Sequence, residues 1–521
     1  MKSRKSLAKT AGWAVALALA SSATAQTSDA LLNKLVQKGI LTSQEAQELQ
    51  SETDTNNANG FKLKTSKAFK SAEIFGDFRL RYEYRSGEVG PGTLYAGDTE
   101  ALNRWRYALR LGVRGDLTDD FYYGLRLETS PNPRSPWNTF GGASGGNAPY
   151  QGPFSKANNY GVFVGQAYLG WRLGDWLDLS AGRMPQPLYT TPMVWDSDYC
   201  PEGFVEKVQF TSGPVDYFVT LGQFVYQDGN PTTASNAFGL GVVGGTAFNS
   251  GDPFLLTWQA GLTYHFSTNM SVKFAPMAYN YTGHGNTASG FMGPFVGQGT
   301  EYGTTFQNTT TSSSTLPGPS GALVAGSSVN GYNQTGINDL FILEFPAELN
   351  FKLGHYDAKL FGDFAVNIDG DARARAAYAR GEAEAVFANP HYPDPFPGGV
   401  QLDNDKAYQV GLAVGNKLGT AYGTAVKKGG WEARVYWQHV EQYALDPNLL
   451  DSDFFEGRGN LQGIYSAFAY GLSDAMIATV RYGHAQRINN DLGTGGFNAD
   501  MPLINPVNKY DLVQVDLTLK F

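Results

Sequence analysis

The sequence is poor in three features: cysteine, charge and long apolar runs. Cys200 is the only cysteine, so no disulfide can form within the chain and other interactions must hold the fold. Only 17% of the residues are charged, but the mean hydropathy is negative, whereas an all-helical membrane protein would be far more apolar. The apolar run 11–20 is well short of the ~20 residues that a spanning helix needs, and no other segment approaches that length.

Positive charge is also in the minority. The chain has 39 Lys and Arg residues against 48 Asp and Glu residues, which gives a net charge of −9. Four of the basic residues, Lys2, Arg4, Lys5 and Lys9, lie in the first 25 residues, so their removal would take the net charge from −9 to −13. Such a chain does not suit a basic nucleic-acid-binding surface, and we expect no nucleic-acid partner.

Residue types used in catalysis or metal binding do not form a recognisable pattern. The six histidines are scattered, and no two have metal-ligand spacing. The segment 142–146 formally matches G-x-S-x-G, but it lies in a Gly- and Asn-rich loop rather than on a strand-to-helix elbow. A barrel enzyme such as a lipid hydrolase would need a Ser and a His on one strand face, and no such pair is found. We therefore expect no enzyme, no cofactor and no bound metal.

What the sequence does contain begins with an export signal. Basic residues precede the apolar run, and Ala23, Thr24 and Ala25 form a small-residue cleavage site before Gln26. We predict that residues 1–25 are a signal peptide that is cleaved after Ala25, and that the chain is exported.

Residues 26–70 are predicted to be a periplasmic helical segment followed by a linker. Apolar residues keep helical spacing up to Gly39, and Thr42 with Glu45 makes a capping box for a second short helix. Residues 28–50 would then self-associate or contact the cell wall; alternatively, they are a small cap on the barrel rim or a spacer. Residues 51–70 are polar and without pattern, which is typical of a linker.

From residue 71 onward the dominant pattern is strict alternation of apolar and polar residues. Side chains on a strand point alternately to opposite faces, so each such segment has one apolar and one polar face. In the last one, Val513, Val515, Leu517, Leu519 and Phe521 share a face. The predicted strands, about sixteen in number, lie near 74–85, 104–114, 121–128, 161–172, 175–184, 203–211, 214–226, 258–266, 270–282, 337–352, 356–366, 408–414, 431–437, 459–472, 474–486 and 513–521.

Pro276 lies inside one of these segments, 270–282. Because proline cannot donate to a sheet ladder, we predict a bulge there at which the strand changes register.

Short connections alternate with long ones along the whole segment. The short ones fall near 117–120, 173–175, 212–213, 268–269, 353–355, 420–427 and 473, and the long ones near 86–101, 131–159, 185–202, 227–252, 283–336, 370–403, 444–458 and 487–508. This alternation returns the last strand beside the first, so the sheet can close. A soluble β-sandwich also alternates, but it has no reason to separate loop lengths in this way.

Together these patterns predict that residues 71–521 form an all-β, transmembrane antiparallel barrel of about sixteen strands. In lipid each unpaired backbone group costs several kcal/mol, so an open sheet edge cannot face the bilayer. Tyr and Trp residues near the strand ends suit the aromatic girdles at the membrane interfaces.

One long loop carries the specific motifs. Ala181–Pro187 contains Gly-Arg and a Pro-rich bend, Val194–Asp198 contains Trp-Asp-x-Asp, and Pro201–Phe204 contains Glu-Gly. With the helical segment and the C-terminal strand, this loop resembles the bacterial outer-membrane "putative porin" family, which is similar to phosphate-selective and general 16-stranded porins. The resemblance implies that the third outer loop folds inward and narrows the pore.

The same resemblance implies roles for particular residues and partners. It places Asp196, Asp198 and Glu202 near the constriction, although these acids could instead only pin the loop or bind a cation. It makes Phe521 a signal read by the barrel assembly machinery, and it implies a homotrimer.

Arginines gather on the polar face of the first three predicted strands. They are Arg79, Arg81, Arg104, Arg106, Arg110, Arg114 and Arg126. Charges on a water-filled lumen wall stay solvated, and a basic wall opposite acids would create a transverse field that tunes ion preference. Two alternatives are an anion path along the arginines and structural salt bridges to Asp77, Glu83 and Glu128.

We therefore expect a passive outer-membrane diffusion channel for small hydrophilic solutes and ions, surrounded by outer-membrane lipid. The closest alternative is an anion-selective channel, for example for phosphate. A barrel that serves as an envelope tether or adhesin is the second alternative, in which residues 28–50 would be the essential part.

Overall fold

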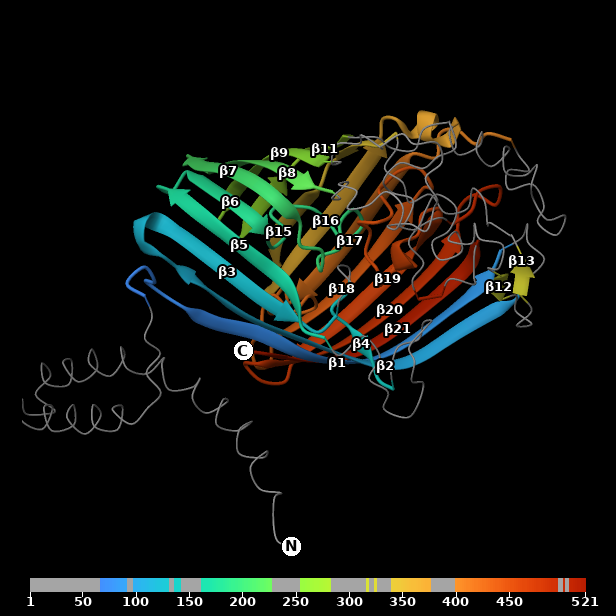
Figure 1. Cartoon of the computed structure of the whole chain (residues 1–521), viewed down its shortest axis with the longest axis horizontal. Coiled ribbons are helices and arrows are strands. Elements are labelled where there is room, and N and C mark those ends of the chain that lie inside the picture. Colours follow the sequence, from blue (N-terminus) through green and yellow to red (C-terminus); the bar gives the residue numbers. More distant parts are fainter. Residues whose placement is uncertain are drawn as a thin grey trace, which may run out of the picture. The chain divides into compact units, whose positions relative to one another are not determined.

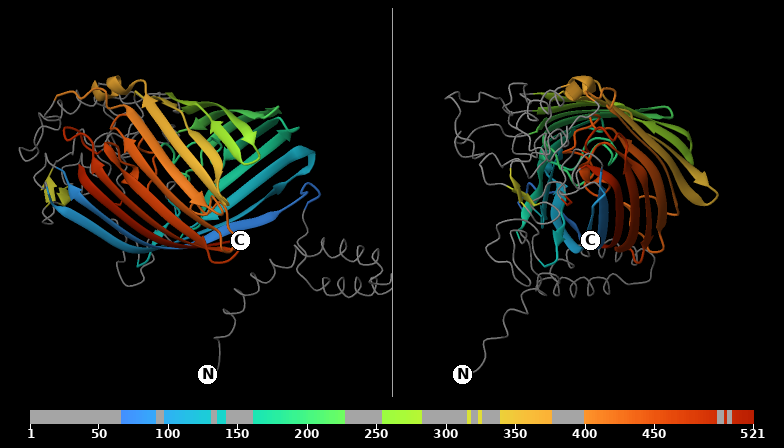
Figure 2. Two further views of the ribbon diagram at one scale, coloured as in Figure 1. Left: turned by 180° about the vertical axis from the view of Figure 1, so that it is seen from behind. Right: turned by 90° about the vertical axis from the view of Figure 1, so that its right-hand side faces the viewer.

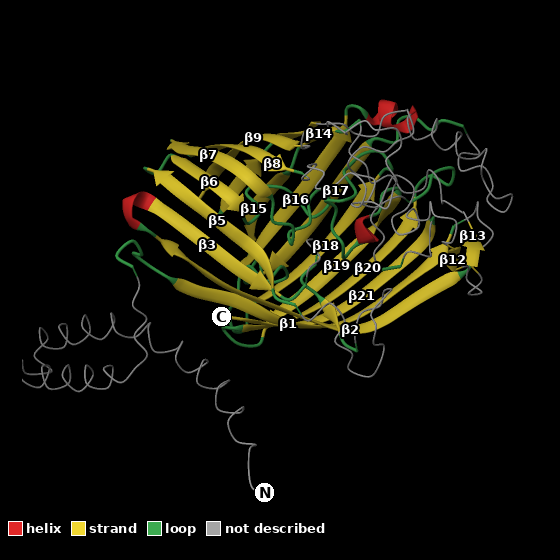
Figure 3. Ribbon diagram, viewed as in Figure 1, coloured by secondary structure: helices red, strands yellow, loops and turns green. Residues whose placement is uncertain are grey.

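The computed structural model describes residues 66–90, 97–130, 135–141, 161–226, 254–282, 315–317, 323–325, 339–375, 399–494, 500–501 and 506–521. The predicted signal peptide 1–25 and helical segment 28–50 lie outside these described residues. Strands make up most of the described residues, and the rest is mainly loop and turn with very little helix (Figure 3). Within the described ranges no helix has the length and apolar character needed to cross a membrane.

The strands of the large sheet follow one another in antiparallel order around a ring (Figure 1). They are β1 (Glu73–Val89), β2 (Thr99–Asp116), β3 (Phe121–Glu128), β4 (Asn138–Thr139), β5 (Phe163–Leu173), β6 (Leu177–Arg183), β7 (Glu202–Ser212), β8 (Val215–Val225), β9 (Phe254–Ser267), β10 (Met270–Phe274), β11 (Met277–Thr282), β14 (Phe341–Glu344), β15 (Ala347–Leu353), β16 (Tyr356–Asn367), β17 (Lys406–Gly415), β18 (Trp431–Val440), β19 (Leu461–Gly471), β20 (Met476–Arg487) and β21 (Val507–Lys520). A separate hairpin consists of β12 (Thr315–Pro317) and β13 (Leu323–Ala325).

These segments make sixteen barrel strands. β10 and β11 are two halves of one strand, because both pair with β9, and β14 and β15 are two halves of the next, because both pair with β16. β4 is a two-residue strand that pairs with the outer part of β2. The predicted strand number is therefore confirmed.

The ring closes between the first strand and the last. β1 pairs with β2 along one edge and with β21 along the other, from Asp77 opposite Lys520 to Glu88 opposite Lys509. At its end, Phe521 exchanges two backbone hydrogen bonds with Gly76, at 2.9 and 3.1 Å. β1 is therefore paired along both edges, and Figure 2 shows the strands curving round to form a continuous wall.

The two faces of the wall follow the alternation in the sequence. On β2, Trp105, Leu109 and Leu111 are exposed on the outer face, whereas Arg106 and Ala108 are buried on the inner one. The same parity holds on β21, where Val515 and Leu517 are exposed and Asp516 is buried. The apolar band therefore lies outside the ring and the polar residues lie inside it, as the period-two pattern predicts.

Pro276 interrupts its strand, but the prediction that the register changes there is wrong. Phe274 lies opposite Leu262 and Met277 lies opposite Gln259, which is one continuous register on β9. Pro346 breaks the neighbouring strand at the same level, and the amide of Ala275 donates to its carbonyl at 3.1 Å. Two adjacent breaks remove the ladder bonds that proline cannot make while the pairing continues on either side.

The connections divide the barrel into two ends, which we call the short-turn end and the long-loop end. At the short-turn end one connection differs from expectation: residues 416–430 join β17 to β18, a longer link than the predicted 420–427. It folds inward, since Glu432 on β18 accepts from the amides of Gly419 and Ala421 at 2.7 and 3.1 Å. At the long-loop end, residues 184–201 and 441–460 enter the bore and bury a shared apolar cluster.

The two faces of the wall make a first prediction. Val219 lies on the outer face of β8, 38% exposed, between Val208 and Ala260. Val219→Arg places a charge toward lipid and should lower the free energy of unfolding in lipid vesicles by about 2–4 kcal/mol if the site is near the bilayer midplane. The matched variant Gln209→Arg adds the same charge to the inner face of β7 and should cost much less. Equal losses for both variants in urea titrations would contradict the assignment of faces.

Candidate pore constriction

The predicted arginine ladder lies on the inner face of β1, β2 and β3, and every member of it has a carboxylate partner. Arg81 is 3% exposed, and its guanidinium donates to Asp516 on β21 and to Asp453 in the 441–460 loop, each at 2.7 Å. It also lies over the ring of Trp137, 4.2 Å from the centroid. Burial in this low-dielectric setting is tolerated because both charges of each pair are matched.

Glu83 is the central acid of the part of this wall that is nearer the long-loop end. Its fully buried carboxylate accepts from Arg104 at 2.6 Å and from Gln514 at 2.9 Å, and Arg106 lies 3.6 Å away. Arg85, which the sequence reasoning did not single out, is also fully buried and bridges Glu83 to Glu456 at 3.2 Å each. The alternation of side chains along β1 assigns Arg85 to the same inner face as Arg81, so the sequence did indicate that Arg85 faces the bore.

The lower part of the wall pairs with other acids. Asp77 accepts from Arg79 at 2.7 Å and from Arg110 at 2.9 Å. Arg126 donates to Glu128 at 3.1 Å and lies 3.5 Å from the Cys200 thiol. Arg114 forms a half-exposed pair with Glu73, close to the short-turn end. The three structural salt-bridge partners named from the sequence, Asp77, Glu83 and Glu128, are thus all engaged.

The 184–201 loop crosses the bore from this wall to the opposite one. At one side Asp198 accepts from Arg110 on β2 at 3.0 Å. At the other side Thr190 donates to Glu344 on β14 at 2.7 Å, and Thr191 donates to Asp363 on β16 at 2.5 Å. β2 is the second of the sixteen barrel strands and β14 begins the tenth, so the two attachment sites are diametrically opposed.

The 441–460 loop meets the 184–201 loop inside the ring, where Figure 3 shows loop segments enclosed by strands. The amide of Asp196 donates to the Leu449 carbonyl at 2.6 Å, and the amide of Ser452 donates back to the Asp196 carboxylate at 3.0 Å. Sequence reasoning identified 444–458 only as one of the long outer connections and did not predict that it folds inward. The apolar pairs Leu449–Leu450 and Phe454–Phe455, all buried, were a signal for its inward position.

The predicted constriction acids end up in three different settings. Asp198 faces the arginines, as its ion pair with Arg110 shows. Asp196 is buried at the junction of the two loops and has no arginine partner among its described contacts. Glu202 lies on the outer face of β7 with Phe204 and pairs with Arg183 on β6 at 2.5 Å. Glu202 is therefore not among the residues that surround the bore.

Four acids, Asp196, Asp198, Asp451 and Asp453, lie close together at the junction of the two loops. Their surroundings shift their pKa values in different directions. Burial, followed by the negative charges of Asp451 and Asp198, raises the pKa of Asp196 well above its usual range. Burial and the nearby Asp453 raise the pKa of Asp451 to about 7. Burial also favours the neutral form of Asp453, but Arg81 and Arg85 outweigh it and hold the pKa of Asp453 below its usual value.

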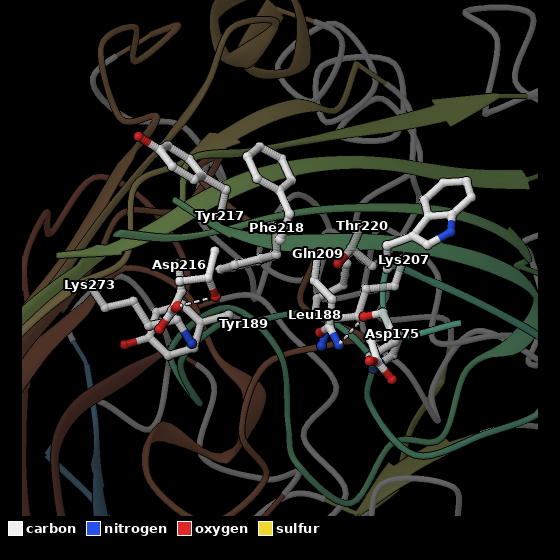
Figure 4. Close-up of a pocket in the computed structure, with 14 residues that line it drawn as sticks. Asp175, Leu188, Tyr189, Lys207, Gln209, Asp216, Tyr217, Phe218, Thr220 and Lys273 are labelled. Carbon is white, nitrogen blue, oxygen red and sulfur yellow. Dashed lines mark hydrogen bonds between the residues drawn. The ribbon is translucent and has the colours of Figure 1, made fainter. Parts of the chain in front are cut away.

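A cavity of about 730 Å³ lies at the short-turn end, where residues 187–189 of the crossing loop border it (Figure 4). Its lining includes Lys207 on β7 and Lys273 on β10, the sixth and ninth barrel strands, outside the wall that carries the arginines. The Lys273 ammonium lies 3.6 Å from the centroid of the Tyr189 ring. Sequence reasoning did not single out either lysine.

Within the described ranges, no group of three or more His, Cys, Asp and Glu side chains is arranged to hold a metal ion. The acids of the junction instead use their oxygens on backbone amides, as Asp451 does for Asp453 at 3.1 Å.

The loop junction predicts a pH dependence. A carboxyl whose folded pKa is raised contributes full stability below its ordinary pKa of about 4 and loses that contribution as pH rises through the folded value. For Asp451 this loss falls between about pH 4 and 7, so the junction should loosen as pH rises. Hydrogen exchange of the Ser452 and Asp196 amides, corrected for the intrinsic rate, should be roughly tenfold or more faster at pH 8 than at pH 5.

The variants that check this prediction are isosteric. Asp451→Asn stays neutral at every pH and should flatten the profile. Asp119→Asn, in the exposed turn before β3, should leave it unchanged. A profile that Asp451→Asn does not alter would show that another group controls the junction.

Comparison with known proteins found similar solved structures and a matching family model. Among solved structures, the chain is similar to OprB of Pseudomonas putida at high pH (12% identity, 91% of this chain and 97% of that chain covered, TM-score 0.42). It is also similar to OmpF of Salmonella typhi in complex with daunomycin (9%, 88% and 99%, 0.41) and to an anion-selective porin from Comamonas acidovorans (10%, 87% and 99%, 0.38). No curated protein matches the chain.

The family assignment comes from a family model rather than from these structures. The model described as putative porin matches residues 88–521, which is most of the chain and includes fifteen of the sixteen barrel strands in full. The chain therefore belongs to the "putative porin" family: it is an outer-membrane channel and not an enzyme.

Proposed function

We propose that the channel passes small hydrophilic solutes and ions by passive diffusion, and that the 184–201 loop narrows its bore. The observation that carries this proposal is the attachment of one loop to two diametrically opposed walls, through Asp198 to Arg110 and through Thr190 to Glu344. A bare ring of sixteen strands leaves a wide lumen, so a tethered crossing segment is what limits the size of the solute. The bore is lined by polar groups, which suits hydrated rather than apolar cargo.

The 441–460 loop supports the crossing segment in this proposal. Asp453 binds Arg81 and Arg85 on β1, and the loop backbone then bonds to the 184–201 loop. The upper arginines would thus act as anchors for a loop rather than as a bare anion path. Of the ladder residues, Arg110 bonds directly to Asp198 and would shape the field at the narrowest level.

We also propose how the channel reaches and occupies its membrane. Residues 1–25 would direct export and be cleaved after Ala25, and residues 26–70 would remain in the periplasm, where 28–50 could contact the cell wall. Phe521, which is 54% exposed beside the closing pair of strands, would be read by the barrel assembly machinery. The outer apolar band would contact outer-membrane lipid.

We propose, in addition, that the barrel associates into a homotrimer. Support comes from polar groups on the outer face of adjacent strands: the Arg183–Glu202 ion pair on β6 and β7, and Glu206, which accepts from Gln223 on β8 at 3.0 Å. Charged groups are costly toward lipid, and the cost falls if a second copy of the chain covers them.

The attachment of the 184–201 loop to the wall leads to a functional prediction. Thr190→Val with Thr191→Val removes both hydroxyl donors to Glu344 and Asp363, and each lost partner of a buried polar group costs about 1–3 kcal/mol. The loop should detach from that wall, so the unitary conductance in planar bilayers should rise and become noisier. Thr118→Val with Thr268→Val, in two turns at the short-turn end, is the matched control and should behave as the unaltered protein.

The outcomes distinguish a failure of the proposed diffusion channel from a failure of the proposed role of the loop. If the unaltered protein gives no ion conductance, it is not a diffusion channel. If it conducts but the double variant has the same conductance as the control, the 184–201 loop does not set the bore.

A further inference from the structure

The charges of the lumen are distributed unevenly between neutralised and free groups. On the arginine wall each guanidinium has a carboxylate partner, as in the pairs of Arg79 and Arg110 with Asp77. Lys359, on the opposite wall, is likewise paired with Glu348 at 2.7 Å. Lys207 and Lys273 differ, because in the described part of the chain neither forms an ion pair. Lys207 and Lys273 therefore add positive charge to the bore that no ion pair among the described residues neutralises.

Both lysines face the same cavity, of about 730 Å³, at the short-turn end (Figure 4). Lys207 is on β7, two residues from Gln209 on the same inner face, and Lys273 is on β10, opposite Thr263. This volume is within the range of cavities that hold small organic ligands, about 300–1,000 Å³.

Lys273 is held by an aromatic ring instead of an acid. Its ammonium lies 3.6 Å from the centroid of Tyr189 and 5.3 Å from that of Phe218. Tyr189 itself is fixed, because Gln259 accepts from its amide at 2.9 Å and donates to its carbonyl at 2.7 Å. Glu348 lies opposite Lys273 in the pairing of β10 with β15, but it forms its ion pair with Lys359 at 2.7 Å. A cation–π contact positions Lys273 without neutralising its charge, so the ammonium can still attract an anion.

The remainder of the lining defines the type of anion. Leu188, Pro187 and Phe218 give the cavity an apolar wall beneath the crossing loop. Two acids also line it: Asp216, which accepts from Thr211 at 2.7 Å and lies 2.8 Å from His265, and Asp175 in the turn before β6. Asp216 is engaged by these partners, whereas neither lysine has an ion-pair partner among the described residues.

We propose that this cavity is a binding site for a small organic anion with an apolar body, such as an aromatic carboxylate. Lys207 and Lys273 bind the carboxylate, and Leu188 and Phe218 contact the apolar body. The site lies on the short-turn side of the crossing loop, so a solute that passes the constriction meets it next. The proposal rests on the proposed diffusion channel and identifies the solute class that the channel retains and favours.

The test uses the full mature protein in planar bilayers, with benzoate as the probe. Benzoate should reduce the chloride conductance in a saturable way, and benzamide, which has the same shape without the charge, should not. Acetate, which has the charge without the apolar body, should need a higher concentration. Lys207→Gln with Lys273→Gln should raise the half-effective benzoate concentration at least tenfold, which corresponds to about 1.4 kcal/mol.

The matched control removes the same charge at the same end of the barrel. Lys417→Gln with Lys428→Gln alters two exposed lysines in the 416–430 connection, outside the cavity, and should leave the benzoate effect unchanged. Benzoate binding to the detergent-solubilised protein, followed by saturation-transfer NMR, gives a readout that does not depend on conductance.

Three results would overturn the site. They are an equal effect of benzamide and benzoate, an unchanged benzoate response in the Lys207 and Lys273 variant, and an equal loss in the control variant. Each of them leaves a conducting channel intact. A protein that does not conduct at all would instead refute the diffusion channel, and benzoate binding in detergent would then decide the site separately.

Discussion

Closure of the hydrogen-bond ladder between β1 and β21 is the constraint on which the rest of the structure depends. A backbone amide or carbonyl that faces hydrocarbon has no water to bond, so a sheet can cross a bilayer only if it has no free edge. The pairing of β21 with β1, continued by the Phe521–Gly76 bonds, meets that condition. Once the ring is closed, alternation sends every second side chain inward, and the inner surface becomes a protected polar environment.

That environment explains why loops can fold into the bore. A loop that carries acids would be unstable against an apolar core, but here Asp453 and Asp198 find arginines that the strands already present. Each pair lowers the cost of burying both of its charges. The consequence is electrostatic as well as structural. The arginine wall is largely neutralised by its partners, whereas Lys207 on β7 and Lys273 on β10 carry positive charge without an ion pair among the described residues.

The orientation of side chains on the strands could be predicted from the sequence, because a period of two fixes which residues point inward and which point outward. This period placed the seven ladder arginines on the inner face. It also assigns Arg85 and Asp516 to that face. The positions of loop residues could not be derived in this way. The partner of Arg81, Asp453, is 372 residues away along the chain in a loop of no regular period. The inward loop came from family resemblance, and the motif misplaced Glu202, which already belongs to β7 and takes its outer face.

The most direct measurement is the size limit of the open channel, determined from the effect of neutral polymers of graded size on single-channel conductance. The account predicts that polymers small enough for a bare sixteen-stranded ring are nevertheless excluded from the narrowest level, because a loop spans the bore between β2 and β14. A cut-off as large as the unobstructed ring, or the absence of any conductance, would contradict it.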